Sequence, residues 1–150
     1  FDPVLKVIAA IHCGWQGNTK NIIEKTVAKM VAEFGCDAKN LLVAISPSLG
    51  PCCAEFSKPH EELPEFMHKY IVDEGHAKLP RSKFFRRPVS GSLHVDLWQC
   101  SFDQLTACGV LLENIDIARR CTVCENDKFF SYRADKGKTG RMAGVIMFVC

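Results

Sequence analysis

Apolar and polar positions along the chain follow a helical spacing most clearly over residues 20–34. Apolar side chains fall on one face of this stretch and charged side chains on the other, which predicts an amphipathic helix. Asn18 or Thr19 can cap its start, and Gly35 can end it in the left-handed conformation. The apolar positions expected to face the core are Ile22, Ile23, Val27, Met30, Val31 and Phe34.

Two further helices are expected, over residues 61–72 and 96–108. The second of them has Asp96 as a good capping residue and Gly109 as a stop. A polar, basic stretch over 75–91 lies before it and is interpreted as a surface excursion. The inward positions expected in these two helices are Leu63, Phe66, Met67, Tyr70, Ile71, Leu97, Phe102 and Leu105.

Short apolar runs predict strands. The run 4–11 has little polar interruption, which suits a strand covered on both faces, and 41–45 is a second short buried strand. Strand, helix and strand within the first 45 residues indicate a right-handed crossover unit. If its two strands are parallel neighbours, the loops that follow them meet at one edge of the sheet. Further strands are expected at 115–118, 129–133 and 142–149, with turns at 2–3 and 136–139.

Length and composition limit the classes of protein that the chain can represent. Its 150 residues, 47% of them apolar, suit one domain over 1–150 with a real core. A net charge of only +2 without a dense basic run does not suggest nucleic-acid binding. No apolar stretch approaches the roughly 18 residues of a membrane span, and no secretory signal is visible. The start at Phe1, almost directly in a core strand, suggests a fragment.

Nine cysteines are many for this length, and the count is odd. Several of them occupy positions typical of buried helices or strands, where cysteine behaves as a small hydrophobe. We therefore expect a reduced intracellular protein and no disulfide framework.

The most unusual stretch is residues 8–17, in which an apolar run stops at His12 and leads into a glycine-containing loop. A histidine at the end of a strand borders the crevice in which open α/β sheets bind ligands. Gly14 and Gly17 let the backbone turn sharply or approach a ligand closely. A satisfied structural histidine explains His12 equally well, and Trp15 is explained equally as a core residue or as a stacking surface for a planar ligand.

Metal binding can be considered from the ligand types alone. A catalytic zinc needs three protein ligands. The chain has no second histidine close to His12 in the sequence at a spacing that would let both bind one ion. Cys121 and Cys124 form a lone C-x-x-C. The adjacent Cys52 and Cys53 do not form a second C-x-x-C that could complete a zinc site. A structural role is therefore expected for Cys121 and Cys124. The full set of candidate ligands is His12, Cys13, Cys52, Cys53, His94, Cys121 and Cys124.

Two other kinds of chemistry remain open. Cys53 near His12 would form a thiolate nucleophile with His12 as its base. The alternative is that Cys53 is a buried, inert cysteine. Arg133 and Arg141 flank a turn and can bind phosphate or carboxylate by a forked contact, or they are solvated surface charges.

Taken together and in order, these motifs resemble the YfiH-like laccase-domain family, once called multicopper polyphenol oxidoreductases. The His-Cys-Gly-Trp-Gln-Gly stretch at 12–17 is similar to the family's His-Ala-Gly-Trp-Arg-Gly motif, and the resemblance covers essentially the whole chain. The other stretches that carry it are Gly50-Pro-Cys-Cys53, Val95-Asp-Leu-Trp98, Cys121-Thr-Val-Cys124, Phe129-Phe-Ser-Tyr-Arg133 and Gly140-Arg-Met-Ala143.

The resemblance implies an α+β fold, a layered sandwich of mixed β-sheets with flanking helices that is shared with a deamidating toxin domain. It implies a zinc-dependent cytoplasmic enzyme whose partners are a purine nucleoside and phosphate. The activities it implies are phosphorolysis of purine nucleosides, a transferase reaction, and deamination of adenosine, a hydrolase reaction. Copper and phenol oxidation rank lower, because one histidine and scattered cysteines do not resemble a multicopper ligand set.

The resemblance also implies roles for single residues. His12 matches one zinc ligand, and the other two ligands would precede Phe1, so the chain is expected to hold an incomplete zinc site. Gln16 stands where the family usually has arginine or lysine, and Cys13 where alanine is usual. Arg133 and Arg141 become candidate phosphate or ribose contacts, and Trp15 and Gln16 candidate substrate contacts.

An inactive scaffold that binds partners and a Cys–His hydrolase remain as alternatives to the enzyme. The sequence leaves the nucleoside and the oligomeric state open.

Overall fold

The computed structural model describes residues 1–72 and 93–148. The chain forms two compact units, and each is described by itself. The first unit comprises residues 1–45, 99–118 and 144–150, and the second comprises residues 46–98 and 119–143. The expectation of one domain over 1–150 stays a prediction.

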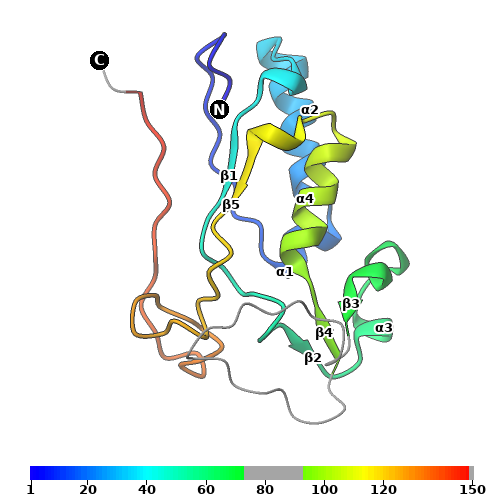
Figure 1. The fold of residues 1–150 in the computed structure, drawn as a ribbon, viewed down its shortest axis with the longest axis vertical. Coiled ribbons are helices and arrows are strands. Elements are labelled where there is room, and N and C mark those ends of the chain that lie inside the picture. Colours follow the sequence, from blue (N-terminus) through cyan, green and yellow to red (C-terminus); the bar gives the residue numbers. More distant parts are fainter. Residues whose placement is uncertain (73–92, 149–150) are drawn as a thin grey trace. The chain divides into compact units, whose positions relative to one another are not determined.

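The first unit combines helices with one pair of parallel strands (Figure 1). The strands pair in the register Val43 with Ile115 and Ile45 with Ile117. Helix α4, Leu97–Ala107, begins in the second unit and continues into this one. The other elements of the first unit are α1 (Trp15–Thr19), α2 (Ile22–Phe34), η1 (Ala38–Asn40), β1 (Val43–Ile45), η3 (Leu112–Asn114) and β5 (Ile115–Ile117).

The core of the first unit lies where α2 and α4 pack against the strand pair. Its buried members come from both helices and from the segments that lead into the strands, and half-buried strand residues such as Val43 and Ile115 pack against them. Burial of these apolar surfaces is the main stabilising contribution of the unit. The buried members are Ile23, Val27, Met30, Cys36, Leu41, Leu105 and Val110.

The helix predicted over 20–34 is confirmed as α2, although it begins two residues later. Its N-cap is Asn21, with a φ of 52°, and not Asn18 or Thr19. Gly35 ends the helix as predicted, with a φ of 71° and its N–H bonded to the carbonyl oxygen of Val31. Val31 and Phe34 are predicted to face the core, but they are 44% and 54% exposed. The buried face of the helix is therefore narrower than the face that carries its apolar residues.

The predicted strand over 4–11 is wrong. Asp2 is fully buried, and its Oδ1 accepts the backbone N–H groups of Val4 and Leu5 at 2.9 and 3.0 Å. This Asx-type turn bends the chain back on itself, and an isolated antiparallel bridge between Asp2 and Val7 closes the bend. The predicted crossover unit is wrong for the same reason, because the parallel neighbour of β1 is β5.

The second unit holds a small antiparallel sheet with the strand order β2-β4-β3. Each strand is only two or three residues long, so loops make up much of the part of this unit that the structure describes. Its elements are β2 (Glu55–Phe56), α3 (Pro59–Glu62), η2 (Glu65–Tyr70), β3 (Ile71–Val72) and β4 (Leu93–Val95).

The helix predicted over 61–72 is replaced by α3, the 3₁₀ helix η2 and the strand β3. Pro64 causes the break, because it lacks an N–H and forces the preceding Leu63 into an extended conformation with a ψ of 145°. Leu63, Met67 and Tyr70 are buried as predicted, whereas Phe66 is 43% exposed.

Of the remaining predicted elements, some are confirmed and others are wrong. The helix over 96–108 is confirmed as α4 and the strand over 115–118 as β5. The strand over 129–133 is wrong, because local backbone bonds such as Asp135 N–H to Ser131 O fold this stretch into turns. Described residues 142–148 form no strand, so the last predicted strand is wrong for them. The predicted surface excursion over 75–91 lies outside the described residues.

Helices with mixed parallel and antiparallel pairing confirm the predicted α+β class. Within the described ranges, no helix has both the length and the apolar character needed to cross a membrane.

We expect Leu41→Ala to lower the free energy of unfolding of the full-length protein by about 2–5 kcal/mol, because Leu41 is only 2% exposed in the core of the first unit. The neighbouring Leu42 is 43% exposed, so Leu42→Ala is a matched control that should cost no more than about 1 kcal/mol. Urea denaturation followed by circular dichroism measures both. Equal losses in the two variants would contradict this account of the core.

Candidate functional site

The loop that follows β1 and the loop that follows β5 are joined side by side in the second unit. An isolated parallel bridge links Ser48 to Cys121. The N–H of Ser48 donates to the carbonyl oxygen of Arg120 at 3.1 Å, and the N–H of Thr122 donates to that of Ser48 at 3.0 Å. This pairing fixes the residues that follow Ser48 against those that follow Arg120.

Four cysteines meet at this junction, and we call them the cysteine cluster: Cys52, Cys53, Cys121 and Cys124. Their sulfur atoms all lie within 4.8 Å of one another. The Sγ atom of Cys124 is 3.4 Å from that of Cys52 and 3.6 Å from that of Cys53. All four are free thiols, with Cys52 and Cys121 buried. Among the described residues, this is the place where three or more potential metal ligands gather.

Both loops curl so that each pair of cysteines faces inward. The N–H groups of Cys53 and Ala54 donate to the carbonyl oxygen of Gly50 at 3.0 Å, and the N–H of Glu125 donates to that of Cys121 at 3.0 Å. The Gly50 N–H also donates to the Sγ of Cys121 at 3.4 Å. Backbone N–H groups aimed at sulfur stabilise a thiolate.

Glycine is required at position 50 because the backbone comes very close to its neighbours. A Cβ atom there would lie 2.8 and 2.9 Å from two atoms of the Trp98 indole and 3.0 Å from the Cβ of Cys121. Trp98 is itself buried and donates from Nε1 to the Oγ of Ser48 at 2.8 Å. The indole ring therefore forms a rigid support under the first loop of the cluster.

The four thiols differ in acidity. Hydrogen bonds from the thiols of Cys52 and Cys53, together with the N–H groups of Cys124 and Gly50, lower the pKa of Cys121. Hydrogen bonding to Cys121 and burial raise the pKa values of Cys52 and Cys53. Burial also raises the pKa of Cys124.

Two further side chains hold the first loop from other directions. His94 is buried, and its Nδ1 donates to the carbonyl oxygen of Pro51 at 2.9 Å, so this candidate ligand supports the cluster from outside it. Arg133 donates from Nη1 to the carbonyl oxygens of Cys53 and Glu55 at 3.3 and 2.6 Å. Its guanidinium lies 5.9 Å from the centre of the Phe56 ring.

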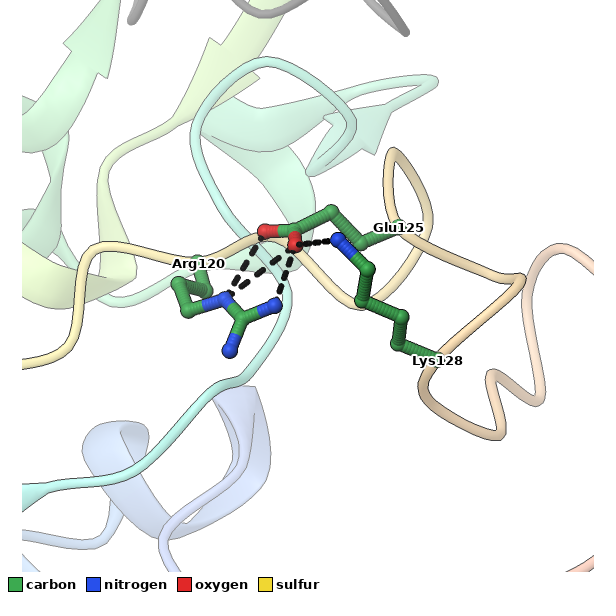
Figure 2. A network of polar contacts seen from close by, with 3 residues as sticks. All are labelled: Arg120, Glu125 and Lys128. Atoms are coloured by element: carbon green, nitrogen blue, oxygen red, sulfur yellow. Dashed lines mark hydrogen bonds and ion pairs between the residues drawn. The ribbon is translucent and has the colours of Figure 1, made fainter.

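An ion-pair network holds the ends of the second loop (Figure 2). Arg120, next to Cys121, donates from Nε and Nη2 to the carboxylate of Glu125, which follows Cys124. Lys128 approaches the same carboxylate at 3.5 Å, and the Arg120 guanidinium lies 4.6 Å from the centre of the Phe129 ring. Arg120 holds the pKa of Glu125 below its usual value. The network closes the loop at both ends of the C-x-x-C.

The second feature of interest is the His12 segment, residues 12–17, in the first unit. His12 is exposed in a stretch without regular structure, and a Cβ atom on Gly14 would lie 3.7 Å from its Nε2. Trp15, 37% exposed, and the exposed Gln16 begin helix α1, which was expected to be a loop. These three side chains are accessible to a ligand.

Asn18 anchors the His12 segment to helix α4. It is 1% exposed, and its Oδ1 accepts hydrogen bonds from Ser101 Oγ at 3.2 Å and Gln104 Nε2 at 3.3 Å. Its Nδ2 donates to the carbonyl oxygen of Gly14 at 3.4 Å. Sequence reasoning considered Asn18 only as a helix cap and missed this role. A polar pair on the inward face of α4, Ser101 and Gln104, was the available signal.

The structure therefore separates the predicted site residues. His12, Trp15 and Gln16 belong to the first unit, whereas Cys53 and Arg133 belong to the second, so the pairing of Cys53 with His12 stays a prediction. Arg141, also in the second unit, donates from Nη1 to the carbonyl oxygens of Thr139 and Gly140 at 3.1 and 3.0 Å. The partner for the C-x-x-C, which the sequence was thought to lack, is the adjacent pair Cys52 and Cys53.

Comparison with known proteins now places the chain. Residues 1–149 match the model of the family described as multi-copper polyphenol oxidoreductase laccase. The chain belongs to this laccase-domain family. The predicted resemblance to YfiH-like proteins is thereby confirmed.

Relatives of the laccase-domain chain include a purine nucleoside phosphorylase of Bacteroides thetaiotaomicron, 34% identical over 147 residues, which are 98% of this chain and 51% of the relative. Another is the human purine nucleoside phosphorylase LACC1, 32% identical over 97% of this chain and 32% of the relative. The chain thus spans about half the length of the bacterial protein and about a third of the human one.

Solved structures support the same placement. The chain is similar to YlmD from Geobacillus stearothermophilus with a TM-score of 0.65 and 30% identity, over 86% of this chain and 44% of that one. It also shares its fold with the hypothetical protein YfiH of Bacillus licheniformis, with a TM-score of 0.70 and 24% identity, over 93% of this chain and 49% of that one.

We expect Gly50→Ala to lower the free energy of unfolding by about 1–3 kcal/mol, because the new methyl group meets the indole of Trp98 and the Cβ of Cys121. Gly144→Ala is a matched control, since a Cβ atom there meets nothing within 4 Å, and it should change stability by about 0.5 kcal/mol or less. Thermal unfolding of both variants of the full-length protein measures the difference. A Gly50→Ala protein as stable as Gly144→Ala would contradict the close packing described here.

Proposed function

We propose that the protein to which this chain belongs is a purine nucleoside phosphorylase. The observation that carries the proposal is that relatives of that name match nearly the whole chain, at 34% identity over 98% of it in the Bacteroides protein. The exposed His12 segment, held to α4 through buried Asn18, is the part of the first unit best suited to bind a ligand. Its partners would be a purine nucleoside and phosphate.

In phosphorolysis an oxygen of phosphate bonds to C1′ of the ribose as the bond from C1′ to the base nitrogen breaks. The base leaves with the electron pair and takes up a proton, and ribose 1-phosphate remains. Trp15 would stack on the purine and Gln16 would contact the substrate, while Arg133 and Arg141 would bind phosphate or ribose by forked contacts. Each of these roles rests on the type and accessibility of its residue.

The family resemblance also implies a zinc ion bound by His12. In the described part of the chain, potential ligands gather at the cysteine cluster, and His12 is not among them. The described residues therefore do not fit a metal at His12 by themselves. We still assign His12 a role at the reacting atoms of the substrate. As the ion bound there, zinc ranks above copper.

Adenosine deamination, in which water replaces the amino group of adenosine and ammonia leaves, is a second activity that the resemblance favours. The Cys–His hydrolase ranks lower, because hydrogen bonding to Cys121 and burial raise the pKa of Cys53, and a thiol is a weaker nucleophile than a thiolate. An inactive scaffold remains the alternative from another class. A cytoplasmic, reducing location suits the free thiols of the cluster.

The proposed activity is tested by incubating the full-length protein with adenosine, inosine or guanosine, with and without phosphate. We expect release of the free base together with ribose 1-phosphate, both only when phosphate is present, as measured by chromatography. His12→Ala should lower kcat/KM by about 100-fold or more, the range for loss of a catalytic group.

The control is His60→Ala, because His60 is also an exposed histidine and lies in the second unit. It should retain the activity of the unmodified protein. Base release that does not need phosphate, or unchanged kinetics in His12→Ala, would overturn the assignment. Ammonia release from adenosine without base release would favour the deaminase instead.

Gln16 offers a test in which activity is gained. It is exposed in α1, so Gln16→Arg should fold normally and would add a fixed positive charge beside a bound anion. We expect the KM for phosphate to fall about fivefold, which corresponds to about 1 kcal/mol of charge-assisted binding. Gln16→Met, which has similar length and no charge, should not lower it. An unchanged KM for phosphate in Gln16→Arg would place position 16 away from the anion.

A further inference from the structure

The geometry points to a second metal site, separate from any ion at His12: the cysteine cluster binds one Zn²⁺ through its four sulfur atoms and holds the two loops of the second unit together. Each loop contributes two ligands, Cys52 and Cys53 from the loop after β1 and Cys121 and Cys124 from the loop after β5.

The distances between the sulfur atoms suit a tetrahedral ion. A zinc–sulfur bond of about 2.3 Å places the sulfur atoms of a regular tetrahedron about 3.8 Å apart. The sulfur atom of Cys124 lies 3.4 Å from that of Cys52 and 3.6 Å from that of Cys53, and all four sulfur atoms lie within 4.8 Å of one another. Changes of about 1 Å or less in these separations would complete the coordination. Four thiolates fill the coordination sphere, which is the mark of a structural zinc.

The surroundings can accommodate the charge of such a site. Four thiolates and one Zn²⁺ carry a net charge of −2, because each thiol gives up its proton on binding. The Gly50 N–H already donates to the Sγ of Cys121 at 3.4 Å. Arg133 is bonded to the carbonyl oxygen of Cys53, which places a positive charge beside the first loop. Arg120 precedes Cys121 in the second loop.

The support around the loops also favours a fixed site. Trp98 and His94 hold the backbone at Ser48 and Pro51, and the ion pair of Arg120 with Glu125 closes the second loop. Hydrogen bonds of this kind orient metal ligands before the ion arrives. Four protein ligands would leave no open position on the ion, so the zinc would be structural and not catalytic.

Elemental analysis of the full-length protein tests this inference without measuring activity. The decisive comparison is made in a His12→Ala background, which removes any ion that depends on His12. We expect one zinc per chain to remain there and to be lost when Cys121→Ser and Cys124→Ser are added. Cys108→Ser is the matched control, because Cys108 is a half-buried free thiol of the first unit and lies outside the cluster. It should keep the zinc.

A second measurement needs no variant, which protects the test if the double substitution fails to fold. Titration of the unmodified protein with an organomercurial should release one zinc in step with modification of the four cluster thiols. Cobalt in place of zinc should give the charge-transfer absorption of thiolate ligands.

Three results would overturn the inference. The first is zinc content that the cluster substitutions leave unchanged. The second is cluster cysteines that resist alkylation until a reductant is added, which would make them disulfides. The third is iron or copper in the cluster in place of zinc.

Discussion

Four sulfur atoms within 4.8 Å of one another form the constraint on which the second unit depends. Thiols at such distances have three stable states: protonated and hydrogen-bonded, oxidised to disulfides, or ionised around a cation. Disulfide bonds would require sulfur atoms about 2.05 Å apart, well below the observed 3.4 and 3.6 Å. A shared cation is the state that uses all four side chains at once and keeps both loops in the conformation seen here.

The small size of the regular structure in the second unit explains why such a fastening is useful. Strands β2 and β3 have two residues each and β4 has three, so the hydrogen bonds and apolar surface of this sheet contribute little stability. A structural metal can hold loops together where the strands between them are short. Here the loops carry the close packing, from the Trp98 indole against Gly50 to the ion pair of Arg120 with Glu125.

Sequence reasoning succeeded where a local signal was decisive and failed where a distant partner decided the outcome. Gly35 and Gly109 mark the ends of α2 and α4 because each adopts a positive φ. The run 4–11 has the composition of a strand, yet buried Asp2 turns it through local hydrogen bonds. Pro64 was a visible breaker in the predicted helix over 61–72, and its effect was underestimated.

The candidate site shows the same division. The rule that loops after parallel strands meet at one edge was sound, but it was applied to the wrong pair of strands. With β5 as the neighbour of β1, the rule brings Cys52 and Cys53 to Cys121 and Cys124. No pattern within the sequence separates adjacent cysteines that are ligands from adjacent cysteines that fill a core. Only the strand pairing, which spans about 70 residues of sequence, supplies that information.

A closed four-sulfur site changes how the metal content of this family member must be interpreted. Such a site has no open position, so its ion cannot activate water, phosphate or a phenol. A catalytic ion at His12 would need an open position and ligands of another type. One zinc per chain is therefore compatible with an active enzyme, an inactive scaffold or a protein whose catalytic ion has been lost. Assigning the ion to His12 or to the cysteine cluster shows whether a catalytic ion is present, and total metal content does not.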